Sequence, residues 1–351
     1  LEFRRVLFRS TSESFEEGTV GLDMTLSLFE GFSRINQVRF RKMNKERSEW
    51  ELKEKQNELA YQVTDAYYKL ILERKLLDLA LEQSRLSERY LKQTEVFVEL
   101  GLKSASDLQE VKARREGDIY RYQSRGNSSR IALLHLKQLM NIQPGDTLAI
   151  LDTITASQLP PYSVSTVETL YAQSIEILPS IRMIDLKQKA AHKEYAIAGG
   201  AFSPSVFARF TVGSNYYNTA FSARQLRDNI GKYVGVGISF PLLSGLQRLT
   251  NQRKLKLNMY RLKNEEELEK QQLYTDIEQT LLSLHTGYSE HQQALSQLDA
   301  ETLVLKESER KWEEGLISVF QLMEARNRFI AAKAELVRVR LQIEMMMKLE
   351  K

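Results

Sequence analysis

Apolar residues recur along this chain with two different periods. Over 20–28, 206–212 and 234–242 they alternate with small or polar residues. Such alternation predicts strands with one apolar and one polar face, each about long enough to cross a bilayer at a tilt. Over 277–305 they recur in alternating steps of four and three residues, which predicts a helix packed against other helices. The pattern therefore predicts a mainly α fold with β-strands.

Two long segments carry the helical period. Residues 32–99 and 246–314 contain no proline, and Gly287 is their single glycine. Each segment predicts a rod of about 100 Å. A glycine, a short polar turn and a shorter helical segment follow each rod, at 105–140 and 319–349. The chain is therefore expected to form two long antiparallel helical hairpins with exposed tips.

The chain repeats itself at an offset of 214 residues. Residues 20–26 align with 234–240, and 101–104 align with 315–318, without a gap. The seam of the second rod is Ile277, Leu281, Leu284, Tyr288, His291, Leu295, Leu298, Thr302 and Leu305. Subtracting 214 predicts the seam of the first rod at Val63, Tyr67, Leu70, Arg74, Leu77, Leu81, Ser84, Glu88 and Leu91. An internal duplication predicts that both copies build equivalent parts of one assembly.

The repeat divides the chain into parts. Residues 20–140 form the first repeat, with a strand, a long helix, a tip and a return helix. Residues 178–351 form the second repeat, with a helix and two strands before its long helix. Between them, prolines and an alternating stretch at 147–154 predict a linker over 141–177 that contains a loop and a strand. Residues 1–19 fit neither repeat and are interpreted as a truncated or non-native leader.

Composition excludes several classes of protein. A hydrophobic fraction of 42%, a charged fraction of 27% and only 6 prolines favour long helices over many small domains. The absence of cysteine excludes disulfides and thiolate metal sites. The 50 basic and 46 acidic residues are interspersed, so that no strongly basic face and no nucleic-acid partner are expected. The sequence has no run of about 18 apolar residues, so no transmembrane helix is expected.

The sequence predicts no enzyme, no cofactor and no metal site. The four histidines, His135, His192, His285 and His291, lack the spacing of metal ligands, and His291 lies on the helical seam. Serine, histidine and aspartate residues are scattered on helices, and no serine lies in the turn motif that activates a hydrolase nucleophile.

The two matching turns are the most specific candidate site. Gly101 and Gly315 can take the left-handed conformation that closes a helix, and Ser104 and Ser318 can cap the helices that follow. Four polar residues lie at matching places just past the turns, namely Asp107, Glu110, Gln321 and Glu324. One interpretation is that acids here are favoured by the dipole at the start of a helix.

These features resemble the TolC-type family of outer-membrane efflux and secretion channels. The similarity covers most of the chain and rests on the strand-to-rod junctions at 27–34 and 240–248 and on the tips at 100–108 and 314–322. It implies a homotrimer in which strands of all protomers share one transmembrane β-barrel in outer-membrane lipid. The long hairpins would form an α-barrel, and region 141–177 would pack as an equatorial belt around it.

The resemblance also implies a function. The protein would be a passive conduit in the outer membrane of a Gram-negative bacterium, serving tripartite efflux or type I secretion. A periplasmic adaptor, also called a membrane fusion protein, would connect it to an inner-membrane pump. The adaptor would meet the tips, formed by Gly101, Leu102, Ser104, Gly315, Leu316 and Ser318. Asp107, Glu110, Gln321 and Glu324 would line an entrance constriction that favours cations, although the uncharged Gln321 departs from the family pattern.

The helix at 178–198 and the strand at 205–215 have no counterparts 214 residues earlier, so the resemblance implies a helix, a strand and a signal peptide before residue 1. The alternative class of protein is a soluble or peripheral coiled-coil scaffold, such as a periplasmic adaptor, because amphipathic strands also occur in soluble sandwiches. A channel would need detergent for extraction, whereas a scaffold would not.

Overall fold

A computed structural model describes residues 16–143, 145–150, 159, 166–218, 223–242 and 246–349. The chain forms two compact units, and each takes segments from both halves of the sequence. The first unit comprises Leu1–Trp50 with Ser180–Leu268, and the second comprises Glu51–Pro179 with Glu269–Lys351. The long helices α1 (Ser33–Glu99) and α6 (Gln247–Glu313) each contribute to both units.

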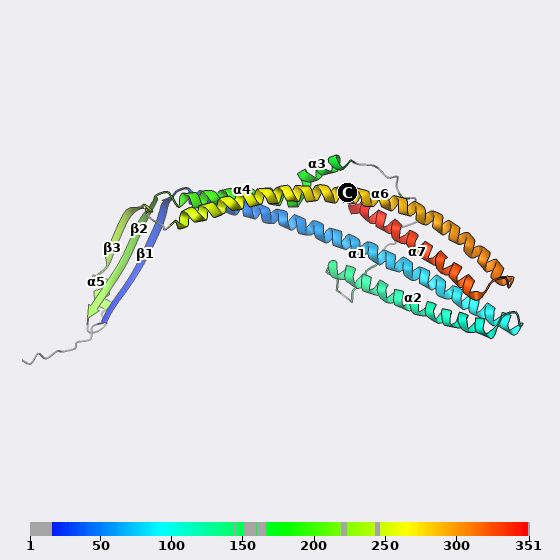
Figure 1. Ribbon diagram of the computed structural model, residues 1–351. Coiled ribbons are helices and arrows are strands. Elements are labelled where there is room, and N and C mark those ends of the chain that lie inside the picture. The colour runs from blue at the N-terminus through cyan, green and yellow to red at the C-terminus, as the bar shows by residue number, and fades with distance from the viewer. Residues whose placement is uncertain are drawn as a thin grey trace, which may run out of the picture. The chain divides into compact units, whose positions relative to one another are not determined.

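The first unit contains an antiparallel sheet of three strands in the order β1-β2-β3 (Figure 1). The strands are β1 (Glu16–Glu30), β2 (Ser205–Asn218) and β3 (Gly231–Ser239). Leu22 lies opposite Val212, and the adjacent Asp23 lies opposite Thr211 and accepts a hydrogen bond from its hydroxyl at 2.6 Å. Since neighbouring residues of a strand project to opposite faces, the predicted apolar and polar faces are confirmed for β1 and β2.

The third strand is shorter than its alternating pattern predicts. It ends at Ser239, so Phe240, Pro241 and Leu242 lie beyond it. Pro241 has no backbone N–H to donate to a neighbouring strand, which explains the early end. The short helix α5 (Ala223–Asp228) precedes β3 and was not predicted. It is held on β2 by the Ser214 hydroxyl, which donates to the Leu226 carbonyl, and Asn229, just after the helix, donates to the Asn215 carbonyl at 2.9 Å.

The junction between β1 and α1 is closely packed. Gly31 and Phe32 have φ values of 58° and 62°, and Leu246, 214 residues after Phe32, also has φ 62°. A Cβ at Gly31 would lie 2.5 Å from the carbonyl oxygen of Gly200, at the end of α4 (Pro179–Gly200). The backbone therefore turns sharply between strand and helix. The corresponding Gly245 lies outside the described residues.

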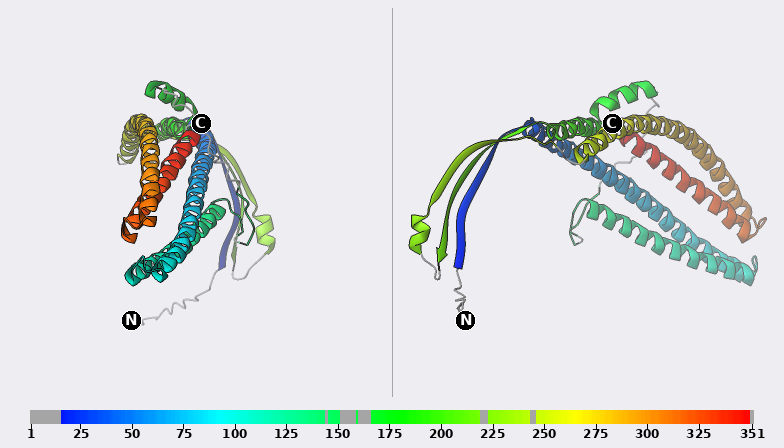
Figure 2. Two further views of the ribbon diagram at one scale, coloured as in Figure 1. Left: turned by 90° about the vertical axis from the view of Figure 1, so that its right-hand side faces the viewer. Right: turned by 60° about the vertical axis from the view of Figure 1, so that its left-hand side comes forward.

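Helix α4 packs along α6 in the first unit (Figures 1 and 2). Gln188 donates to the carbonyl of Leu262 at 3.1 Å, and Leu262 is buried. Lys187 also pairs with Glu265. This contact aligns α4 with the part of α6 that leaves the sheet.

The second unit consists of the two hairpins and a short helix. The hairpins pair α1 with α2 (Ala105–Leu139) and α6 with α7 (Val319–Leu349), and the short helix is α3 (Val167–Ile177). Separate apolar clusters hold the hairpins: Ala66, Leu70, Ala132 and Leu136 between α1 and α2, and Leu284, Val339 and Ile343 between α6 and α7. The predicted hairpins are confirmed. No helix in the described residues has a stretch long and apolar enough to cross a membrane.

The predicted seam is correct for the second rod and wrong by one residue for much of the first. In α6, Leu284 is buried and most of the seam is partly buried, although Thr302 is exposed. In α1 the buried stripe is Ala80, Gln83, Ser87, Tyr90 and Thr94, which lies one residue before the predicted 81, 84, 88 and 91. The reason is that α1 faces α7 as well as α2, since Ser87 contacts both Arg326 and Asp118.

The segment between the repeats differs from its prediction in one respect. Residues 147–150 are not a strand, and 151–154 lie outside the described residues. The helix predicted near 166–177 is present as α3, which Thr166 caps by accepting from the Thr169 N–H. Tyr171 of α3 packs edge-on against Tyr274 of α6, with ring centroids 5.4 Å apart. The linker is therefore attached to the second rod through its helix.

Candidate functional site at the hairpin tips

The two tips have the same backbone geometry. Gly101 and Gly315 have φ values of 72° and 76°. Leu102 N–H donates to the Phe97 carbonyl, and Leu316 N–H donates to the Lys311 carbonyl, both at 2.8 Å. These bonds close the helix ends in the manner of a Schellman motif, which requires a left-handed residue at the glycine position. A Cβ at either glycine would meet no atom within 4 Å, so conformation and not space selects glycine here.

The residues after the turns cap the return helices in the same way. Asp107 N–H donates to the Ser104 hydroxyl at 3.1 Å, and Ser104 N–H donates back to the Asp107 carboxylate at 3.0 Å. Gln321 and Ser318 make the same pair of bonds at 3.3 and 3.0 Å. Both are capping boxes, which accept an amide oxygen as well as a carboxylate. The hydrogen bonds from Ser104 hold the pKa of Asp107 below its usual value.

Capping explains why an uncharged residue can stand at Gln321. Its side-chain oxygen does locally what the Asp107 carboxylate does, so neither residue needs a pore to account for its place. The exposed fractions of Leu102 and Leu316 are 65% and 69%, so the turns present apolar side chains to their surroundings. Glu110 and Glu324 are exposed as well.

Glu110 and Glu324 line one groove between α2 and α7. The groove has a volume of about 390 Å³, and Arg114, Phe320 and Asn327 also line it. Arg114 donates to the Asn327 side chain across the groove, and burial lowers the pKa of its guanidinium. The structure thus brings two of the four predicted entrance residues together beside a cation, while Asp107 and Gln321 serve as caps.

An aromatic cluster lies under both tips. Trp312, with 1% of its surface exposed, packs against Tyr90 and Phe97 with ring centroids 5.6 and 5.4 Å apart. Lys103 from the first tip lies 5.8 Å from the Trp312 ring centroid and donates to the Ile317 carbonyl of the second tip at 3.5 Å. A lysine over an aromatic ring gains a cation–π attraction. Lys103 therefore ties one turn to the other.

A buried polar network joins the hairpins behind the tips. Asp118 and Arg326, each 1% exposed, lie 3.4 Å apart between carboxylate and guanidinium. Gln83 donates to Asp118 at 2.9 Å, and Arg326 donates to the Ser87 hydroxyl at 3.2 Å. Arg121 pairs with the other oxygen of Asp118 at 2.9 Å. Burial lowers the pKa of Arg326, and the charge of Asp118 opposes this shift.

This network is not predicted from the sequence, although one signal for it is present. Arg326 lies on the apolar stripe of the return helix, four residues after Leu322 and three before Phe329. A charge at a seam position must find a buried partner. The partner, Asp118, is 208 residues away in the sequence, and no local pattern identifies it.

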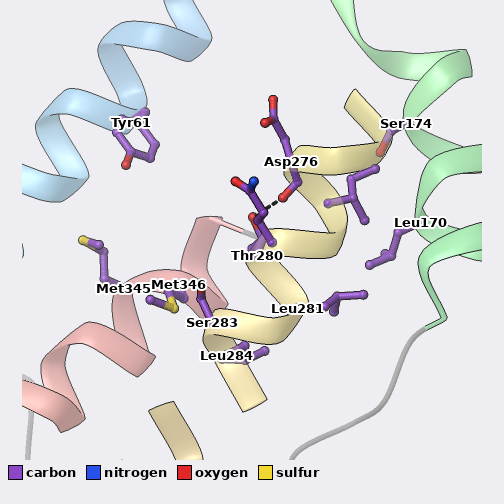
Figure 3. Close-up of a pocket in the computed structure, with 12 residues that line it drawn as sticks. Tyr61, Leu170, Ser174, Asp276, Thr280, Leu281, Ser283, Leu284, Met345 and Met346 are labelled. Atoms are coloured by element: carbon purple, nitrogen blue, oxygen red, sulfur yellow. Dashed lines mark hydrogen bonds between the residues drawn. The ribbon is translucent and has the colours of Figure 1, made fainter. Parts of the chain in front are cut away.

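A pocket of about 670 Å³ lies farther from the tips, between α3, α6, the end of α7 and Tyr61 of α1 (Figure 3). Apolar side chains, including Leu170, Leu281 and Met346, line it together with Ser174 and Thr280. Asp276 is the charged residue among the described residues of its lining, and its carbonyl accepts from the Thr280 hydroxyl at 2.7 Å. Such a lining suits helix packing better than catalysis.

Comparison with known proteins identifies the family. The profile of the outer membrane efflux protein family matches residues 170–345, which is half of the chain. The chain belongs to this family. The predicted resemblance is therefore confirmed, and members of the family are outer membrane efflux channels. No curated protein matches the chain.

Solved structures of outer membrane proteins share the fold. The outer membrane protein VceC of Vibrio cholerae matches with a TM-score of 0.76 and 14% identity, over 96% of this chain and 86% of that chain. The CmeC outer membrane channel of Campylobacter jejuni matches with a TM-score of 0.75 and 13% identity, over 96% and 76%. The MtrE outer membrane channel of Neisseria gonorrhoeae matches with a TM-score of 0.73 and 16% identity, over 96% and 79%.

Proposed function

We propose that the protein is the outer-membrane channel of a tripartite efflux or type I secretion system in a Gram-negative bacterium. It would act as a homotrimer and a passive conduit, without catalytic activity. A periplasmic adaptor would dock on the tips, and an inner-membrane pump would supply the energy. The observation that carries the proposal is the pair of identical exposed turns on a fold shared with outer membrane efflux channels.

The sheet supports a place in the membrane. Leu22, Met24, Val236 and Ile238 are all more than half exposed and share the apolar face. In a trimer the strands would close into one barrel, with this face toward lipid and the Asp23 face toward water. The alternative, a soluble coiled-coil scaffold, would leave this apolar face in water, which is unfavourable.

The contacts between the hairpins suggest where the entrance would open. Movement of α2 and α7 away from each other would break the Lys103–Ile317 and Arg114–Asn327 hydrogen bonds. It would also separate Glu110 from Glu324. Three copies of these acids around a narrow entrance would concentrate a negative potential and favour cations.

The first test replaces the tip glycines. Gly101→Val with Gly315→Val would force β-branched residues into left-handed conformation, which is strained by about 1–2 kcal/mol per residue. Export in cells should fail while trimers still assemble. Gly101→Asn with Gly315→Asn is the matched control, because asparagine tolerates this conformation, and it should keep export. Normal efflux by the valine variant at normal abundance would contradict docking through these turns.

The second test places arginine on either face of the sheet. Leu22→Arg or Ile238→Arg should destabilise the inserted protein, by up to about 2–4 kcal/mol near the bilayer centre, whereas Ser239→Arg, beside Ile238 on the opposite face and opposite Ser205, should have little effect. Denaturant unfolding from vesicles measures the difference. Gly237 is unsuitable as a control, because a Cβ there would lie 2.5 Å from the Phe207 ring. Equal effects on both faces would contradict membrane insertion of the sheet.

The third test concerns the entrance. Glu110→Gln with Glu324→Gln should reduce cation preference in single-channel recordings, since both carboxylates lie in the shared groove. Asp107→Asn should change it less, because Asp107 does not line this groove. Unchanged selectivity in the double variant would place the constriction elsewhere.

A further inference from the structure

Charge is not interspersed along the two long helices where they leave the sheet. Over 33–47 the basic residues are Arg34, Arg39, Arg41, Lys42, Lys45 and Arg47, against Glu46 alone. Over 247–261 the basic residues are Arg248, Arg253, Lys254, Lys256 and Arg261, with no acidic residue. The whole chain has 50 basic and 46 acidic residues, so these two segments depart strongly from its average. The predicted interspersion of charge therefore does not hold for these two segments.

Six of these residues form a group named the basic collar. They are Arg39, Arg41, Lys42, Arg253, Lys254 and Lys256. The two groups lie at the offset of 214, and two pairs of residues coincide across it, Arg39 with Arg253 and Lys42 with Lys256. All six are exposed, and none has an ion pair with another residue that the structure describes. Intramolecular pairing therefore does not explain the collar.

Helix stability does not explain the collar either. The helix dipole acts within the first turn, and the collar starts six residues into each helix, beyond its reach. Lysine and arginine are no better helix formers than glutamine and glutamate, so helix propensity does not explain an excess of basic over acidic residues.

The place of the collar identifies its partner. Both helices leave the same end of the sheet (Figure 1), and the collar begins about 9 Å and ends about 14 Å along each helix. Side chains on a helix lean toward its start, which here is the sheet end, and long basic side chains reach farther in that direction. The polar headgroup layer extends roughly 5–7 Å beyond the hydrocarbon core on each side of a bilayer. Attraction to anionic headgroups persists over a Debye length of about 8 Å.

Exposed apolar residues lie among the basic ones, as in other surfaces that bind at a membrane interface. Ile35 and Val38 lie between Arg34 and Arg39, and Leu249 and Leu257 lie on either side of Arg253 and Lys256. Nucleic acid would not require such apolar neighbours. A bilayer whose core is crossed by the adjacent strands supplies both an apolar and an anionic contact.

We infer that the basic collar binds anionic phospholipid headgroups in the periplasmic leaflet of the outer membrane. The inference rests on the proposed insertion of the sheet in that membrane. The collar fixes the depth at which the strands end and the helices begin, because each basic side chain near the surface favours an anionic headgroup. The preference of the protein for anionic over zwitterionic lipid follows from these residues.

The test measures lipid preference of the inserted protein. Wild-type protein is reconstituted in phosphatidylcholine vesicles that contain trace spin-labelled phosphatidylglycerol or spin-labelled phosphatidylcholine, and the relative association constant is measured. Each basic residue near the surface should contribute up to about fivefold to the preference for phosphatidylglycerol. Arg39→Gln, Lys42→Gln, Arg253→Gln and Lys256→Gln together should remove most of that preference. In the wild type, 1 M salt should reduce it as well, because the Debye length falls to about 3 Å.

A matched control removes the same charge from the same helices far from the sheet. Arg89→Gln, Lys92→Gln, Lys306→Gln and Lys311→Gln also replace exposed bases and should leave the preference unchanged. If the collar variant keeps the wild-type preference, the inference is wrong. If the collar variant changes anion selectivity in channel recordings but keeps the lipid preference, the collar lines the pore, and this result also overturns the inference. Failure of the wild type to insert into vesicles would overturn the proposed function and this inference together.

Discussion

The two hairpins have the same turn and different interiors. In α6 and α7 the helices pack through Leu284, Val339 and Ile343. In α1 and α2 the buried residues include Gln83, Ser87, Thr94 and Asp118, which are polar. Turn geometry is a local property of four or five residues, and both hairpins have it. Interior composition depends on the neighbours of each hairpin. Arg326 of the second hairpin is buried against Asp118 and Ser87 of the first.

The largest expected difference between the hairpins concerns equivalent positions just before the tips. Trp312 is buried, and its counterpart Val98 is partly buried. Trp312→Ala should lower the free energy of unfolding by about 3–5 kcal/mol, whereas Val98→Ala should lower it by less than about 1.5 kcal/mol. Denaturant unfolding followed by circular dichroism measures both. Similar losses would mean that the aromatic cluster does not distinguish the two tips.

The buried ion pair between Asp118 and Arg326 can be used to test whether the polar residues inside the first hairpin serve to hold Arg326. Asp118→Leu should lower the free energy of unfolding by about 3–5 kcal/mol, because it leaves a buried guanidinium without its carboxylate. Adding Arg326→Met should recover much of the loss, since an apolar pair of similar volume is often as stable as a buried ion pair. A double-mutant cycle in the same unfolding assay measures the coupling. If the double variant is as unstable as the two single losses added together, the residues are not coupled.

Glycines inside the helices offer a smaller contrast. A Cβ at Gly287 would lie 3.1 Å from Ile343, whereas a Cβ at Gly126 would lie 3.9 Å from Leu77. Gly126→Ala should stabilise by about 0.5–1 kcal/mol through helix propensity. Gly287→Val should destabilise by about 1–3 kcal/mol through overpacking, and Ile343→Ala should relieve part of it. Thermal unfolding measures the change in melting temperature of each variant. Equal changes for Gly126→Ala and Gly287→Val would show that α6 and α7 move apart without cost.

The smallest expected effect is the pH dependence of the two caps. The pKa of Asp107 is lowered in the folded protein, so its contribution to stability is present above the unfolded pKa of about 3.9. That contribution is lost as pH falls through the lower folded pKa. Gln321 does not titrate, so the second cap should be insensitive to acid. Gln321→Asp should add acid sensitivity and Asp107→Asn should remove it, as measured by thermal unfolding between pH 3 and pH 7.

The hairpins, turns and strand faces could be predicted because each is encoded by neighbouring residues. The Gly101 and Gly315 turns and the alternation around Leu22 are of this kind. The ion pair between Asp118 and Arg326 could not, since it depends on which helices become neighbours. The one-residue shift of the buried stripe in α1 has the same cause. The early end of β3 could have been predicted from Pro241 alone.

The distribution of positive φ along the chain has a mechanical meaning. At the tips it falls on Gly101 and Gly315, which accept it without strain, whereas at the strand-to-helix junctions it falls on Phe32 and Leu246 as well. Bulky residues remain in such a conformation only where surrounding contacts hold them, as the close approach of Gly31 to Gly200 does beside Phe32. The start of α1 is therefore held by backbone contact with the end of α4, whereas the two turns are held to each other by side chains such as Lys103. Side-chain contacts can be exchanged without straining the backbone, so a change at the tips need not alter the junction between β1 and α1.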